Sequence, residues 1–145
     1  MPAVFDKNGN LPSTLWLEFA AFERDFGFTE TRKLLLEKAK RYFRILSELG
    51  CKEIIIAGSF VSDKPAPGDI DLCVDITSID YPRLKRDFQE LLKVSGIDSI
   101  KKNHQVHFAL FFDFGSYELL DFFKKDRNDF PRGLVHVSLD FFKKL

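Results

Sequence analysis

Apolar positions recur along this chain with two different periods, one typical of helices and one typical of strands. Apolar residues at every third or fourth position predict a helix over 14–26 and a longer helix over 30–49. Asp80 and Pro82 are typical of a helix start, and the same spacing continues from there to about Val94. We therefore expect three main helices, separated by segments with a different pattern.

The segments between and after these helices have strand patterns. An apolar run predicts a buried strand over 53–57, and alternation predicts strands over 69–76, 105–113 and 133–139. In the second of these strands one face is apolar, and the other carries Asp69, Asp71, Cys73 and Asp75. A short helix is expected over 117–124. This order predicts an α+β fold, in which helices pack on a small mixed β-sheet, as a single domain over 1–145 with an extended N-terminal arm over 1–12.

Composition and charge narrow the classes of protein that this chain can represent. Of its 145 residues, 45% are hydrophobic and 30% are charged, which is typical of a folded domain. Lys plus Arg and Asp plus Glu number 22 each, so a nucleic-acid partner would need a local basic patch and is not our expectation. No apolar run reaches the length of a membrane span, and Asp6 and Lys7 stand where a signal peptide is apolar. We expect a cytoplasmic protein with no membrane partner and with Cys51 and Cys73 as reduced core residues.

Two further compositional features each leave two interpretations open. The 17 Phe residues indicate either a core rich in aromatic rings or an apolar surface for a partner. The charged run from Arg32 to Arg41 predicts the solvated face of the long helix, with a nucleic-acid or nucleotide contact as the alternative.

The segment 58–72 carries the candidate chemistry. Gly58 and Ser59 directly follow a buried strand, where glycine allows a close backbone approach to phosphate and the serine hydroxyl can bind phosphate oxygens. Asp69 and Asp71 are one residue apart on a predicted strand, so their carboxylates project from the same face about 7 Å apart. The loop between the two pairs contains Lys64, which would either contact phosphate or be solvated.

This arrangement predicts a site for a nucleoside triphosphate together with a divalent cation. Two carboxylates on one face repel each other unless a cation or solvent screens them, and Mg²⁺ prefers carboxylate oxygens plus substrate phosphates. Asp69 and Asp71 are therefore candidate ligands of Mg²⁺ (or Mn²⁺), with Gly58, Ser59 and Lys64 as candidate phosphate-binding residues. The alternative is that the two aspartates form the solvated face of an edge strand, where charge blocks edge-to-edge pairing.

Gly-Ser, nine further residues and Asp-Ile-Asp-Leu together resemble the signature of the nucleotidyltransferase superfold, which includes DNA polymerase beta and the minimal nucleotidyltransferases of toxin–antitoxin pairs. The helix before Gly50-Cys51-Lys52-Glu53, the segment 58–64 and the tail with segments 121–127 and 131–135 are also similar, over most of the chain, to a small uncharacterised bacterial family related to nucleotidyltransferases. The resemblance implies transfer of a nucleoside monophosphate to a hydroxyl group, which could belong to a protein acceptor.

The chain departs from the superfold at one position. Active members carry a third carboxylate on a neighbouring strand, and His107 stands at the corresponding place, so catalytic roles would fall to Asp69, Asp71 and His107. Asp113 shares a face with His107 but lies about 20 Å along the strand, so only one of them could reach the site. The departure leaves a second reading open: a catalytically inactive module that acts as a regulator or antitoxin-like partner of a toxin.

Overall fold

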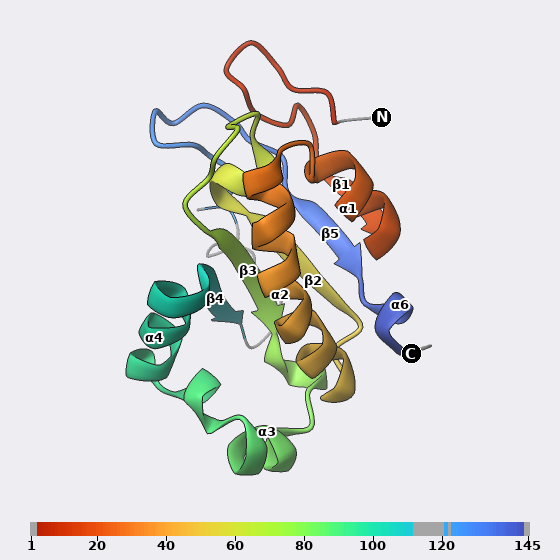
Figure 1. The fold of residues 1–145 in the computed structure, drawn as a ribbon, viewed down its shortest axis with the longest axis vertical. Helices are drawn as coiled ribbons and strands as arrows, with labels where there is room; N and C mark the ends of the chain where they lie inside the picture. Colours follow the sequence, from red (N-terminus) through yellow and green to blue (C-terminus); the bar gives the residue numbers. More distant parts are fainter. Residues whose placement is uncertain (1–2, 112–120, 122, 144–145) are drawn as a thin grey trace.

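The protein has an α+β fold built on a five-stranded open sheet (Figure 1). The structure is a computed structural model that describes residues 3–111, 121 and 123–143. The strand order is β1-β5-β2-β3-β4, with β1 parallel to β5, β3 parallel to β4, and both contacts of β2 antiparallel. The strands are β1 (Leu15–Glu18), β2 (Glu53–Ala57), β3 (Ile70–Asp75), β4 (Val106–Phe111) and β5 (Val135–Ser138).

Two helices cover one face of the sheet and bury most of the core between helices and strands. In Figure 1, α1 lies over β1 and β5, and α2 lies over β2 and β3. The described helices are α1 (Phe19–Phe26), α2 (Glu30–Glu48), α3 (Tyr81–Asp87), α4 (Val94–His104) and α6 (Asp140–Lys143). Among them no helix is both long enough and apolar enough to cross a membrane.

Alternation along the strands separates the main core from a smaller cluster on the opposite face of the sheet. Ile54 and Ile56 of β2 pack with α1 and α2, whereas Ile55 and Ala57 face away from them. On that second face they contact Cys73 of β3, and Ala109 of β4 packs beside them. The carboxylate of Asp71 and the imidazole of His107 belong to this second face, because they lie two residues from Cys73 and Ala109.

The start of the predicted helix over 14–26 is wrong. Residues Leu15–Glu18 form β1, which pairs with β5, and the helix begins only at Phe19. The apolar residues at 15, 17, 19 and 22 fit both periods at this junction, and backbone pairing with Val135–Ser138 selects the strand. The N-cap is accordingly Glu18.

The predicted helix from Asp80 to about Val94 is also wrong in extent, and α4 was not expected. Asp80 does cap α3 by accepting from the backbone N–H of Arg83, but the helix ends at Asp87. A short 3-10 turn over 89–92 follows, and α4 then runs to His104. The segment that forms α4 is mostly polar and buries only Ile100 to a high degree, so its apolar stripe is too weak to be recognised in the sequence.

The remaining predicted elements agree with the structure to within one or two residues at most ends. The helix over 30–49 is α2, with Thr29 as its N-cap, and the predicted strands contain β2, β3, β4 and β5. Cys51 and Cys73 are buried with free thiols. Among the described phenylalanines, Phe19, Phe22, Phe26, Phe43 and Phe60 are buried in the core. Phe112, Asp113 and most of the predicted helix over 117–124 lie outside the described residues.

Candidate functional site

The end of β2 and the start of β3 bring the Gly-Ser turn against an aspartate. Ala57 is the register partner of Asp71, so Gly58, the next residue, lies directly beside the Asp71 side chain. Gly58 has a φ of 72°, and a Cβ at this position would lie 3.1 Å from Cγ of Asp71 and closer still to its Oδ2. Only glycine combines this backbone conformation with this close approach. The chain then enters a 3-10 turn over Gly58–Val61 that contains Ser59.

β4 places His107 next to the same aspartate. Asp71 and His107 are register partners in the parallel pair β3–β4, and Nδ1 of His107 lies 3.2 Å from Oδ1 of Asp71. With Asp71 ionised, the Nδ1–H donates to the carboxylate and leaves Nε2 as the accepting nitrogen. The side chains are 39% exposed for His107 and 23% for Asp71, so the pair stands at the wall of an open site. His104 ends α4 and does not lie in the strand with His107.

Asp69 precedes β3 by one residue and is the other acidic group of the site. Its Oδ2 lies 3.9 Å from Nζ of Lys101 on α4. Burial raises the pKa of Asp71, and the charge of Asp69 raises it further, while His107 and Lys101 act in the opposite direction. Asp69 and Asp71 therefore place two negative charges close together, and a bound cation would relieve their repulsion.

β3 is an interior strand, between β2 and β4. The alternative interpretation of Asp69 and Asp71, as the solvated face of an edge strand, is therefore wrong. Charge is not needed to block edge-to-edge pairing here, because both sides of β3 are already hydrogen-bonded to neighbouring strands.

A buried arginine holds the turn that follows β2. Arg32 is 0% exposed, although the sequence placed it on the solvated face of the helix. Its guanidinium donates to the carbonyl oxygens of Phe60 (2.8 Å), Phe26 (3.1 Å) and Lys64 (2.9 Å), and also to that of Ser62. Burial lowers the pKa of Arg32 to about 10, partly offset by the charge of Asp63.

The same arginine is sandwiched between aromatic rings, which explains how a charged group is tolerated there. Its guanidinium carbon lies 4.1 Å from the ring centre of Phe28 and 4.7 Å from that of Phe60. Thr29, the N-cap of α2, also donates from Oγ1 to the carbonyl of Pro65 at 2.6 Å. The start of α2 thus fixes the chain over 60–65, directly after the Gly-Ser turn, and nothing in the sequence pattern indicated this.

All six residues singled out from the sequence line one cleft of about 1050 Å³. They are Gly58, Ser59, Lys64, Asp69, Asp71 and His107. The cleft is also lined by Lys101, by Asn8 of the N-terminal arm and by side chains between Asp121 and Arg132. None of these added residues was assigned a role from the sequence, although several of them lie in the segments that carry the resemblance. Residues of the segment 121–132 are held at the cleft by long-range contacts, because Asn10 forms hydrogen bonds with Asp126 and Arg132, more than 110 positions away.

The cleft offers a divalent cation only part of a ligand set. Within the described part of the chain no three His, Cys, Asp or Glu side chains are arranged to hold a metal ion. Asp69 and Asp71 supply two carboxylates, and Mg²⁺ is commonly held by one or two carboxylates together with substrate phosphates. Imidazole is a poor ligand for Mg²⁺, so His107 does not complete the set. The residues therefore suit an ion that arrives with a phosphate ligand better than a resident structural ion.

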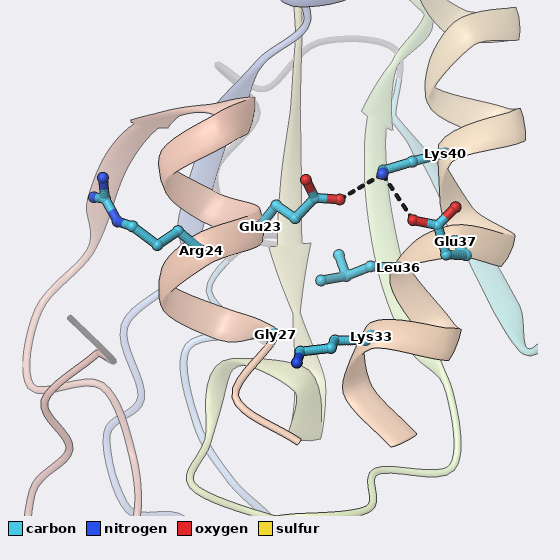
Figure 2. Close-up of a pocket in the computed structure, with 7 residues that line it drawn as sticks. All are labelled: Glu23, Arg24, Gly27, Lys33, Leu36, Glu37 and Lys40. Carbon is cyan, nitrogen blue, oxygen red and sulfur yellow. Dashed lines mark hydrogen bonds and ion pairs between the residues drawn. The ribbon is translucent and has the colours of Figure 1, made fainter. Parts of the chain in front are cut away.

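A second, smaller hollow lies between α1 and α2, in the helical layer (Figure 2). It has a volume of about 350 Å³, with Leu36 on its wall. The ion pair of Lys40 with Glu23 at 2.6 Å joins the two helices, and Lys40 also pairs with Glu37 of its own helix at 2.8 Å. It is a packing groove of the helical layer and contains none of the residues of the cleft on the other face.

Comparison with known proteins assigns the chain to a family but gives no activity. No curated protein and no solved structure was found to match it. Residues 3–138 match DUF6932, a family of unknown function, and the matched range includes all the residues that line the cleft. The chain therefore belongs to the DUF6932 family.

Proposed function

We propose that this protein is a Mg²⁺-dependent nucleotidyltransferase, which binds a nucleoside triphosphate and transfers its monophosphate to a hydroxyl acceptor, which could be on a protein. The supporting observation is the contact of Gly58 with Asp71, which brings the Gly-Ser turn and the Asp69–Asp71 pair to one end of one cleft. The resemblance of this segment to the nucleotidyltransferase superfold gives the same reading.

Each side chain would have a distinct task in that reaction. The turn at Gly58 and Ser59 would bind phosphate oxygens, and Asp69 and Asp71 would hold the ion that accompanies the triphosphate. That ion supplies charge neutralisation and orients the phosphates. The acceptor oxygen forms a bond to the α-phosphorus, the bond from that phosphorus to the bridging oxygen breaks, and pyrophosphate leaves. The acceptor proton goes to Nε2 of His107, whose other nitrogen Asp71 holds in place.

One observation favours a second candidate function. Asp71 is already engaged by His107, which by the resemblance stands where active members of the superfold carry a third carboxylate. A catalytically inactive binding module that acts as a regulator or an antitoxin-like partner is therefore the alternative. Such a module would keep the cleft and act by contact with another protein.

The first test is calorimetric titration of ATP, GTP, CTP and UTP, with and without Mg²⁺ or Mn²⁺. The wild type is compared with Asp69→Asn/Asp71→Asn and with the control Asp98→Asn/Asp140→Asn, which makes the same charge change at exposed positions outside the cleft. Removing two negative charges should favour polyanion binding in general, so a loss of metal-dependent affinity in the first variant alone supports the proposal. If the wild type binds none of the four triphosphates, the enzyme proposal is refuted.

Transfer itself separates the two candidate functions. With an α-labelled triphosphate, the enzyme should release pyrophosphate and label an acceptor, and Asp71→Asn should abolish labelling. For the binding module, Asp69→Asn/Asp71→Asn should leave the complex with its partner protein intact. Labelling that survives in Asp71→Asn would contradict the assigned role of this carboxylate.

A further inference from the structure

The loop over 125–131 forms a wall of the cleft and is tied to the N-terminal arm. Lys125 and Pro131 form an isolated antiparallel bridge that closes the loop. Inside the loop, Oδ1 of Asp126 accepts from the backbone N–H groups of Asn128 at 2.8 Å and Phe130 at 3.0 Å. The loop is therefore ordered by its own hydrogen bonds, and Arg132 follows directly after it.

Asn10 connects this loop to the turn on the other side of the cleft. Its side chain is 0% exposed and donates from Nδ2 to Oδ2 of Asp126 at 2.9 Å and to the carbonyl of Pro131 at 3.3 Å. Residue 10 also forms an antiparallel bridge with Ser62, just after the Gly-Ser turn. With its amide nitrogen committed, Asn10 presents Oδ1 as an acceptor, and Nε of Arg132 donates to it at 2.7 Å.

This contact leaves the terminal nitrogens of Arg132 available to the cleft. Within the described part of the chain, neither terminal nitrogen of Arg132 has a hydrogen bond or an ion pair, and the residue lines the cleft that contains Asp71. Burial lowers the pKa of Arg132, and the charges of Asp126, Asp6 and Asp71 oppose this effect. A half-buried cation without a direct ionic partner favours the approach of an anion.

We propose that Arg132 binds the polyphosphate chain of the nucleoside triphosphate, with Asn10 fixing the direction of its guanidinium. The inference rests on the proposed function and deepens it, because it assigns to the triphosphate a residue from the far end of the chain. A guanidinium fixed at Nε offers two further N–H donors in one plane, which match two phosphate oxygens. Lys64 and Lys101 line the same cleft but provide flexible point charges without this geometry.

The competing explanation is that Arg132 only balances the charge of Asp71. The two explanations differ in how affinity depends on the number of phosphates. A contact to the polyphosphate chain strengthens triphosphate binding far more than monophosphate binding, whereas neutralisation of Asp71 affects both ligands alike.

The test measures dissociation constants for four triphosphates, ATP, GTP, CTP and UTP, for their monophosphates, and for inorganic tripolyphosphate, all with Mg²⁺. Arg132→Gln is compared with the wild type, with Arg132→Lys, and with Arg127→Gln. Arg127 lines the same cleft but is exposed, so Arg127→Gln is a control of equal charge. Thermal unfolding shows whether each variant is folded. If Arg132→Gln does not fold, the dissociation constants of Arg132→Lys are compared with those of the wild type instead.

We expect Arg132→Gln to weaken binding of the triphosphate and of tripolyphosphate about tenfold to a hundredfold. The monophosphate should change by less than about threefold, Arg132→Lys should be intermediate, and Arg127→Gln should stay within about threefold of the wild type, as expected for a screened exposed charge. Equal losses for tri- and monophosphate, or equal effects of Arg132→Gln and Arg127→Gln, would overturn the proposal.

The failure of this inference is distinguishable from failure of the proposed function. If the wild type binds tripolyphosphate through Arg132 but binds no nucleotide, the anion site stands and the nucleotidyltransferase function is refuted. If a triphosphate binds and Arg132→Gln has no selective effect, the function stands and Arg132 has no part in it. If the wild type binds neither ligand, both are refuted.

Discussion

The contact between Gly58 and Asp71 makes a quantitative prediction about the variant Gly58→Ala. A non-glycine residue in the left-handed region costs about 1–2 kcal/mol. The added Cβ would also overlap Oδ2 of Asp71, so that carboxylate must move and give up its hydrogen bond to His107, which contributes about 1 kcal/mol. We therefore expect the free energy of unfolding to fall by about 2–3 kcal/mol.

Gly68→Ala, in the loop that follows this turn, is the matched control. A Cβ on Gly68 has no heavy atom within 4 Å, and Gly68 is not among the glycines with positive φ. Replacing a glycine in a compatible conformation stabilises a protein by about 0.4–1 kcal/mol through the unfolded state. The two alanine variants should therefore change stability in opposite directions, although each adds the same methyl group.

Urea unfolding followed by far-ultraviolet circular dichroism measures this difference, with the m-value as a check that the unfolded state is unchanged. In an Asp71→Ala background the steric part disappears, so Gly58→Ala should then cost only about 1–2 kcal/mol. Equal stability of Gly58→Ala and Gly68→Ala would refute the reasoning, as would an undiminished effect of Gly58→Ala in the Asp71→Ala background.

Three further predictions follow from other parts of the structure. Arg32→Met should lower the free energy of unfolding by more than about 3 kcal/mol, because several buried carbonyls lose their donor, whereas Arg24→Met, on an exposed side chain, should leave it nearly unchanged in the same urea assay. The folded-state pKa of Asp71 is raised, so the contribution of its protonated carboxyl to stability is complete below about pH 4 and is lost as the pH rises through the folded pKa. The free energy of unfolding of the wild type minus that of Asp71→Asn, measured with a metal chelator present, should therefore fall over that pH interval. A difference that rises with pH would contradict the argument that burial raises this pKa. Burial raises the pKa of Cys51 to about 11 and that of Cys73 to about 12, so neither thiol should react with a disulfide reagent at pH 8 until the chain is unfolded, and fast labelling of the native protein would show that the core is open.

Local patterns were sufficient for the elements whose apolar residues follow a single period. The stripe of α2 and the alternation of β3 each fit one periodicity over enough residues to exclude the other. That Asp69 and Asp71 share one cleft at the start of β3 was predicted in the same way, because extended backbone places residues two apart on one face. Gly58 and Ser59 were placed at a strand end by the apolar run before them.

Contacts between distant segments decided the rest. β1 is a strand because β5, about 120 residues later, offers hydrogen-bonding partners to a segment that suits either conformation. Arg32 is buried because carbonyls from two loops and two aromatic rings converge on it, whereas its position in a charged helical run indicates exposure. Likewise, the register of β3 with β4 sets His107 against Asp71, and the fold brings Asn10 and Arg132 together across 122 positions. The hydrophobic period shows which face of its own helix or strand a residue occupies. The burial of Arg32 and the contacts of His107 and Arg132 depend instead on which other segments pack against them.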